Sequence, residues 1–298
     1  MWADRGFEKI GKAEEMMRTI LVPFAPGVPS EPALDAALSL AKRMNSHIRA
    51  VFVRPEPRVA LSYVPQAIAT MITSETIERE DSKTAAEERG RFEAWRSRHG
   101  VPAGAVHHRL DSCFASWLEK VGDIEQVITH YGRVSDLIVM TRFTPDHVQA
   151  QRCFDAALFD TGRPTLLVPG KLPWDMIDHV LVAWNGSVEA SRAAFGVLPL
   201  LHAATRVSLF TVPTPENDET TGAELAEALS WQGIRTYESI HPQNIEPIGA
   251  ALLMAAARCD ASLIVMGAYT HSRLRQSFLG GVTRHVLSEA PIPIVMCH

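Results

Sequence analysis

The chain has little cysteine and no long apolar segment. Its four cysteines include no CxxC pair, so neither a zinc knuckle nor a dithiol redox site is indicated. We expect reduced thiols in a cytoplasmic protein. The longest purely apolar run, Ala250 to Ala257, is far shorter than the ~18 residues of a membrane span. The first residues also lack the apolar core of a signal peptide, so no membrane partner is expected.

An excess of positive charge and the usual catalytic motifs are absent as well. The net charge of −5 argues against a general nucleic-acid binder. No GxxxxGK[ST], GxGxxG or GxSxG motif is present, and no nucleophile has a base beside it. Asp123 and Glu125 are expected to face apart on a helix and to form no acid–base pair. We therefore expect no catalytic residue, no metal site and no enzyme, with slow ATP hydrolysis as the alternative.

What the chain does contain is an internal repeat. A length of 298 residues with 46% apolar and 21% charged residues is typical of two globular domains. Three apolar stretches recur in the same order, which indicates a tandem duplication. The matching pairs are Ile20–Ala25 with Val180–Asn185, Ser135–Met140 with Ala261–Met266, and Gly162–Val168 with Ala290–Met296. The sequence thus predicts a first domain over residues 1–170 and a second over residues 176–298, joined by the linker Lys171–Asp175.

Strands and helices alternate in each copy, which predicts a parallel sheet covered on both faces. We expect an α/β fold of two tandem doubly wound domains, each with five strands in flavodoxin-like order. The elements predicted in the second copy are strands at His179–Trp184, Arg206–Val212, Thr236–Ile240, Ala261–Gly267 and Ile294–Met296, and helices at Val188–His202, Ala223–Gln232, Pro247–Cys259 and Val282–Glu289.

The first copy carries about 34 extra residues, mostly between Arg54 and Gly100. Prolines mark a loop at their start, and a charged helical stretch runs from about Gln66 to His99. Its apolar residues are irregularly spaced. This helix either packs along one edge of the sheet or forms a lid over a pocket.

The most informative stretch joins the last two predicted strands. A buried strand stops at Gly267, a basic loop follows, and a short helix begins after the pair Gly280-Gly281. A helix start left open by glycines offers free N–H groups and the positive end of the helix dipole, which suits phosphate. The alternative is that the glycines only shape turns and the arginines of the loop are solvated.

This pattern resembles the universal stress protein family in its tandem two-domain form, over nearly the whole chain from Thr19 onward. ATP-binding members carry glycine, two residues, glycine, nine residues, then glycine followed by Ser or Thr. Gly267 and Gly280 match the first and third glycines, whereas Thr270 and Gly281 depart from the motif. Asn185 stands where the family has an acidic residue that faces the adenosine. The resemblance implies a flavodoxin-like or adenine nucleotide alpha hydrolase-like fold in each copy. It also implies that the last strands of the two copies meet edge to edge, as in a dimer within one chain.

The residues and the resemblance together give a candidate nucleotide site in the second copy. The expected ligand is ATP or a related adenine nucleotide, with or without Mg²⁺, although an empty site is the alternative. The candidate binding residues are Ala183, Trp184, Asn185, Gly186, Ser187, Val212, Met266, Gly267, Ala268, Arg273, Gly280, Gly281, Val282 and Thr283.

The first copy lacks these features. Its first strand ends at Ala25 with no polar side chain, and Thr141 replaces the glycine that ends the fourth strand. We expect a structural domain with a degenerate nucleotide site there. The expected function is that of a stress-response or regulatory protein that binds nucleotide in its second half. The alternative is a scaffold that binds no nucleotide and acts through protein contacts, including a possible homodimer; the sequence identifies no protein partner.

Overall fold

The structure is a computed structural model. The described residues are 17–56, 74–104, 112–170, 176–211, 220–240, 247–269 and 281–298. Among them, no helix combines the length and the apolar content that a membrane crossing requires.

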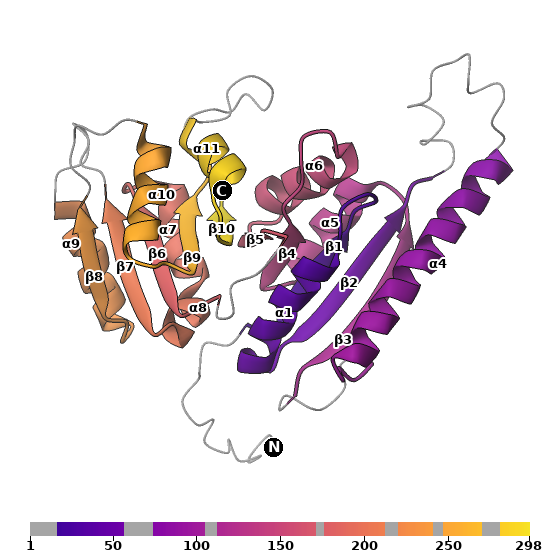
Figure 1. The fold of residues 1–298 in the computed structure, drawn as a ribbon, viewed down its shortest axis with the longest axis horizontal. Helices are drawn as coiled ribbons and strands as arrows, with labels where there is room; N and C mark the ends of the chain where they lie inside the picture. Colours follow the sequence, from indigo (N-terminus) through magenta and orange to yellow (C-terminus); the bar gives the residue numbers. More distant parts are fainter. Residues whose placement is uncertain are drawn as a thin grey trace, which may run out of the picture.

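The ten strands of the described residues form one continuous sheet, in the order β3-β2-β1-β4-β5-β10-β9-β6-β7-β8. The two copies meet in its middle, where β5 and β10 pair antiparallel with Val295 opposite Leu166 (Figure 1). Every other neighbouring pair is parallel. This junction confirms the expected edge-to-edge meeting, which removes two exposed strand edges at once. The strands are β1 (Thr19–Phe24), β2 (His47–Arg54), β3 (Phe114–Val121), β4 (Leu137–Thr141), β5 (Thr165–Val168), β6 (His179–Trp184), β7 (Arg206–Thr211), β8 (Thr236–Ile240), β9 (Leu263–Gly267) and β10 (Ile294–Cys297).

The doubly wound α/β class is confirmed, but the flavodoxin-like strand order is wrong. A flavodoxin sheet has the order 2-1-3-4-5, whereas each half here has the order 3-2-1-4-5. The chain moves outward over the first three strands and then returns to the other side of the first one. Sequence periodicity marks where strands lie but not which neighbour each strand chooses, so the order had to come from the tertiary structure.

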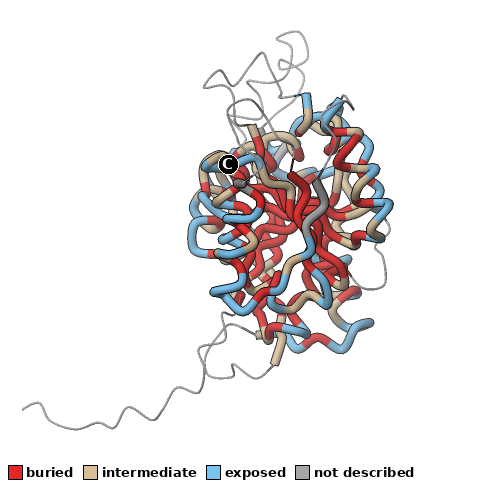
Figure 2. The backbone as a smooth tube through the Cα atoms, turned by 90° about the vertical axis from the view of Figure 1, so that its left-hand side faces the viewer, coloured by how far each residue is buried: buried red, intermediate tan, exposed pale blue. Residues whose placement is uncertain are grey.

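Helices cover both faces of the sheet, and the strands between them are buried (Figure 2). One face carries α1, α4, α7, α8 and α9, and the other carries α5, α6, η1, α10 and α11. The helices are α1 (Glu31–Met44), α4 (Ser74–Arg98), α5 (Ile124–Arg133), α6 (Val148–Asp155), the π-helix η1 (Ala156–Asp160), α7 (Val188–Gly196), α8 (Leu198–Ala203), α9 (Thr220–Trp231), α10 (Ile248–Arg258) and α11 (Gly281–Glu289).

The helix expected over Val188–His202 is two helices. α7 ends at Gly196 and α8 begins at Leu198, with Pro199 in its first turn. Proline has no N–H for the helical ladder, and its ring clashes with the preceding turn. The break at Val197 therefore follows from Pro199, which the sequence reading placed inside one helix.

The extra helix of the first copy, α4, packs on the sheet. Phe92 and Trp95 are buried, and the ring of Phe92 lies 6.5 Å from that of Phe24 in β1 and 5.6 Å from that of Trp117 in β3. Trp95 Nε1 donates a hydrogen bond to Asp35 Oδ1 of α1 at 2.8 Å. The described part of the insertion is therefore an edge helix, as in the first of the two interpretations, and lines the outer side of the first half in Figure 1. Residues 57–73 lie outside the described residues.

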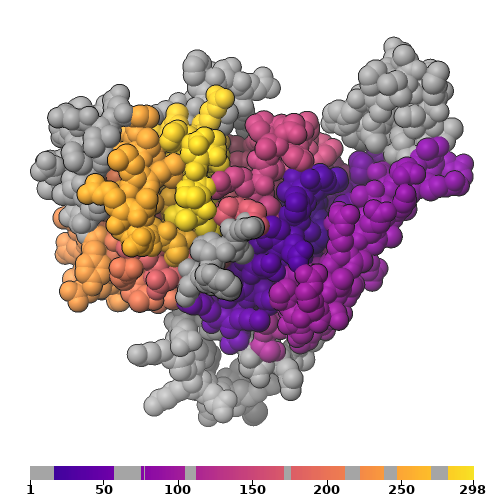
Figure 3. All heavy atoms as spheres, viewed as in Figure 1, coloured from indigo at the N-terminus to yellow at the C-terminus, as the bar shows by residue number. Residues whose placement is uncertain are grey.

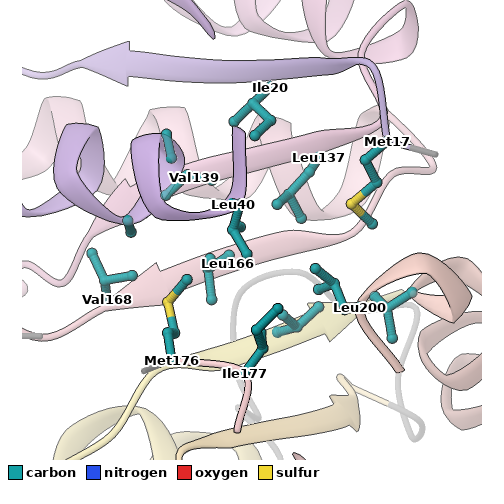
Figure 4. Close-up of a cluster of buried hydrophobic side chains, with 14 of the residues drawn as sticks. Met17, Ile20, Leu40, Leu137, Val139, Leu166, Val168, Met176, Ile177 and Leu200 are labelled. Carbon is teal, nitrogen blue, oxygen red and sulfur yellow. The ribbon is translucent and has the colours of Figure 1, made fainter. Parts of the chain in front are cut away.

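One hydrophobic core extends across the junction of the two halves. Met176, Ile177 and Leu200 of the second half lie in the same buried cluster as Leu166 and Val168 of the first (Figure 4). All five side chains are at most 2% exposed. Separating the halves would expose this surface to water, so the two copies stabilise each other.

Candidate functional site

The predicted site lies at the carboxyl ends of β6 and β9. These strands are neighbours, with Ala183 opposite Met266, and they end at Trp184 and Gly267. From β6 the chain runs to β7 on one side and later returns to β9 on the other. Ligands of open α/β sheets bind where the strand order reverses in this way. The structure thus brings Asn185 and Gly267, which lie 82 positions apart in the sequence, to one edge of the sheet.

The loop after β6 is a tight turn that starts α7. Asn185 Oδ1 accepts a hydrogen bond from the backbone N–H of Ser187 at 3.2 Å, and Gly186 has a φ of 73°. Ser187 is the N-cap of α7, and its hydroxyl accepts a hydrogen bond from Ala190 N at 3.1 Å. The amide oxygen of Asn185 is therefore already engaged by its own turn. A ribose would have to share it or displace that bond.

Packing against α7 explains why position 267 is a glycine, a reason that the sequence did not reveal. A Cβ atom at this position would lie 2.5 Å from Ala190 N and 2.9 Å from the Cβ atom of Glu189. The first turn of α7 thus occupies the space in which a side chain at position 267 would stand. The expectation was that this glycine lets a ligand approach the backbone, but packing of α7 already explains it.

α11 begins at the same edge of the sheet. It lies between the parallel strands β9 and β10, so it runs back across the face and starts near the carboxyl end of β9. Gly281 is exposed, and a Cβ atom there would meet no described heavy atom within 4 Å. Val282 is partly buried and Thr283 is 4% exposed, so these two residues anchor the helix start in the core.

The other predicted residues differ in how accessible they are to a ligand. Met266 and Ala268 are buried, and Ala268 N donates to Cys297 O at 2.8 Å, so neither side chain is accessible to a ligand. Trp184 is half-buried, and its Nε1 atom has no hydrogen-bond partner among the described residues. The predicted contacts that lie outside the described residues are Val212, Arg273 and Gly280.

The equivalent edge of the first half is closed. Thr141, the counterpart of Gly267, accepts a hydrogen bond from Ala33 N in the first turn of α1 at 3.2 Å. A ring carbon of His147 stands 3.3 Å from where a Cβ atom on Gly27 would lie. The hollow between these elements, bounded by Ala25 among others, has a volume of about 10 Å³, which is room for about one water molecule.

Asp123 and Glu125 do not face apart as the sequence suggested. Asp123 is the N-cap of α5 rather than a helical residue, so its side chain is free to turn toward Glu125. Both carboxylates contact Arg152 of α6, at 2.7 Å and 2.8 Å. Burial alone would raise the pKa of Asp123, but hydrogen bonds from Gln126 N and Arg152 hold it below its usual value. These groups form an ion-pair network that joins α5 to α6.

Two contacts across the junction involve residues that the sequence did not single out. Arg142, just after β4, donates hydrogen bonds to the backbone oxygens of Ala290 and Ile292 beyond the end of α11. Tyr269, two residues after β9, packs on Phe159 of η1 with ring centroids 5.2 Å apart. Figure 3 shows α11 in contact with the α6 region of the first half. Only tertiary contacts reveal these residues, because neither belongs to a motif.

Comparisons with known proteins give the same family as the sequence pattern. Residues 243–298 match the model of the universal stress protein family. A search of curated proteins found no match. A universal stress protein from Archaeoglobus fulgidus DSM 4304 is similar in structure, with a TM-score of 0.69 and 16% identity over 95% of this chain and 96% of that one. A protein of unknown function from Pseudomonas aeruginosa PAO1 has a TM-score of 0.53 and 17% identity over 96% and 94%.

Both of these structures align with the two halves of the chain, so they support the fold of the whole chain. A universal stress protein in complex with cAMP covers 41% of this chain and 96% of its own, with 21% identity. Its TM-score of 0.32 is too low to carry an argument about ligands here. Residues 243–298 thus match the universal stress protein family, and the chain as a whole has the fold of the universal stress protein from Archaeoglobus fulgidus.

Proposed function

We propose that the second half, residues 176–298, binds one adenine nucleotide, ATP or a close relative, and that the bound state regulates a stress response. The adenosine would lie over the ends of β6 and β9, beside Trp184 and Asn185. The phosphates would lie at the start of α11. The first half, residues 1–170, is a structural domain in this proposal.

The observation that carries this proposal is the start of α11 at the reversal of strand order. The starts of α5 and α7 are closed by the N-cap side chains of Asp123 and Ser187, which accept hydrogen bonds from Gln126 N and Ala190 N. The residue before α11 in the sequence is Gly280, which has no side chain that could accept hydrogen bonds from the first-turn N–H groups. Such groups and the helix dipole favour an anion.

The charges at the site also fit an anionic ligand. Arg284 is exposed in the first turn of α11, where it could contact phosphate. Asn185 replaces an acidic residue in the family pattern and therefore adds no negative charge beside a phosphate. Bound Mg²⁺ would supply further charge neutralisation, but the proposal does not require it. The turn at Asn185 would present its amide to the ribose or the base.

The test uses the full chain, because the core shared by the two halves makes isolated halves poor reagents. Native mass spectrometry of the purified protein would detect a retained nucleotide. Titration calorimetry with ATP, ADP, AMP and cAMP, with and without Mg²⁺, would then give the affinity and the stoichiometry. One site per chain is expected. Two sites would contradict a degenerate first half, and no binding by any of the four would overturn the proposal.

Two observations favour the alternative of a scaffold that binds no nucleotide. The glycine at position 267 is explained by α7, and the amide oxygen of Asn185 is engaged by Ser187 N. If all four titrations show no binding, the scaffold becomes the better description of this chain. Its function would then rest on surfaces that contact other proteins.

A further inference from the structure

We propose that the first half positions the nucleotide site of the second half, with Arg142 as the main positioning residue. The inference rests on the proposed function of α11. It gives the first half a definite role in binding, although that half has no open site of its own. α11 begins with Gly281, and the first half contacts the chain beyond the end of α11, at Ala290 and Ile292, and beyond the end of β9, at Tyr269.

Arg142 holds the carboxyl end of α11. Its guanidinium donates through Nη1 to Ala290 O and through Nη2 to Ile292 O at 3.4 Å. Ala290 directly follows α11, where carbonyl groups have no partner within the helix and carry the negative end of the dipole, so a cation there is favourable; Ile292 belongs to the loop before β10. Burial lowers the pKa of Arg142. The side chain is therefore partly withdrawn from water, which strengthens its bonds to the carbonyls.

A second contact with the first half is made by Tyr269, two residues after β9. Its φ of 61° is unusual for an aromatic residue and must be maintained by its surroundings. Its ring packs on Phe159 of the first half, and Phe159 also contacts the ring of His298 at 4.8 Å. Burial and the charge of Asp155 raise the pKa of Tyr269 to about 12. The phenol is thus buried beside Phe159 of η1 and within reach of the charge of Asp155 of α6.

The second half does not make the equivalent two contacts with the first half. The counterpart of Arg142 in the second half is Ala268, whose side chain cannot hold the end of η1. The counterpart of Tyr269 is Phe143, which packs within its own half on Phe154 at 5.9 Å. The first half therefore contacts the second half beyond the ends of β9 and α11, and the first half receives no equivalent pair of contacts at these positions.

Arg163 provides a matched control for Arg142. Its guanidinium donates to Arg133 O, at the carboxyl end of α5, through Nε at 3.3 Å and Nη2 at 3.0 Å. This contact has the same chemistry as that of Arg142, but both of its partners belong to the first half. Arg142→Met and Arg163→Met each remove a cation from a helix end and keep an unbranched apolar side chain.

The test compares these two variants in the full chain. Nucleotide affinity is measured by calorimetry, amide hydrogen exchange of residues 281–292 is measured without nucleotide, and thermal melts confirm folding. Arg142→Met should weaken the affinity by about fivefold or more, which is a typical coupling between sites, and should speed exchange in α11. Arg163→Met should change neither. Arg142→Lys keeps a cation that can donate to one carbonyl, so it should restore part of both effects.

The outcomes separate this inference from the proposed function. If the parent chain binds none of the nucleotides, the proposed function fails, and hydrogen exchange alone decides whether Arg142 holds α11. If the parent binds and the two Met variants have equal affinity and equal exchange in α11, the inference is overturned. If Arg142→Met does not fold, Arg142→Lys compared with Arg163→Lys gives the same decision.

Discussion

Gly267 at the end of β9 and Ala190 in the first turn of α7 lie so close that a Cβ atom on the glycine would stand 2.5 Å from the backbone nitrogen of the alanine. A backbone atom cannot move aside as the tip of a side chain can. We expect Gly267→Ala to lower the free energy of unfolding by about 1–3 kcal/mol, as overpacked substitutions do. Urea denaturation measures this. Gly281→Ala is the control, because its Cβ meets open space; equal stability of the two variants would contradict the packing explanation.

Gly281 tests the proposed phosphate contact with little risk to the fold. We expect Gly281→Val to weaken ATP binding at least tenfold, because a side chain at the helix start obstructs a few charge-assisted hydrogen bonds of about 1.5–3 kcal/mol each. Gly281→Ser restores the hydroxyl of the family pattern and should bind ATP as well as the parent or more tightly. Calorimetric titration measures both variants, with thermal melts to confirm folding. Parent-like affinity in Gly281→Val would show that the nucleotide does not use this helix start.

Substitutions of Thr141 test why the carboxyl edge of the sheet is closed in the first half. Thr141→Val preserves the shape of the side chain but leaves Ala33 N in the first turn of α1 without its acceptor. We expect a loss of about 1–3 kcal/mol in the free energy of unfolding, the cost of a buried donor left unpaired. Thr141→Ser keeps the hydroxyl and should lose less. Chemical denaturation of the two variants side by side gives the answer, and the hydroxyl has no such role if Val costs no more than Ser.

His47 should make stability depend on pH in the acidic range. It is buried at the start of β2, where its Nε2 pairs with Ser116 Oγ at 2.8 Å. Burial, aided by the charge of Arg49, lowers its pKa from 6.5 to about 4. His47 therefore binds a proton near pH 6.5 in the unfolded chain, but only near pH 4 in the folded chain.

The contribution of His47 is thus full above pH 6.5 and falls as the pH drops toward 4, by up to about 1.4 kcal/mol per pH unit. We expect His47→Gln to flatten the curve of unfolding free energy against pH in this window. His202→Gln, at an exposed position of α8, should keep the parent's slope. Urea midpoints at intervals of half a pH unit measure both. A His47→Gln curve as steep as the parent's would refute the assignment.

The sequence by itself determined the repeat, the alternation of strands and helices, and most element positions. The strands at His179–Trp184 and Thr236–Ile240 match the structure to the residue, because short runs of strand-forming residues bounded by turn signals are local properties of a chain. Proline inside the predicted helix at Val188–His202 was also a local signal, although its effect at Val197 was underestimated. Periodicity and turn chemistry need no knowledge of distant residues.

The tertiary structure alone decided the strand order, the reason for Gly267 and the roles of Arg142 and Tyr269. Each of these depends on residues far apart in the chain: α7 against the end of β9, and the first half against the chain beyond the ends of β9 and α11. The sequence shows that a residue is a glycine, but not whether a ligand or a neighbouring helix requires it. It likewise shows an arginine without showing whether the side chain is solvated or binds the end of a helix. Contacts between distant residues are set by how the sheet orders its strands, which no local pattern specifies.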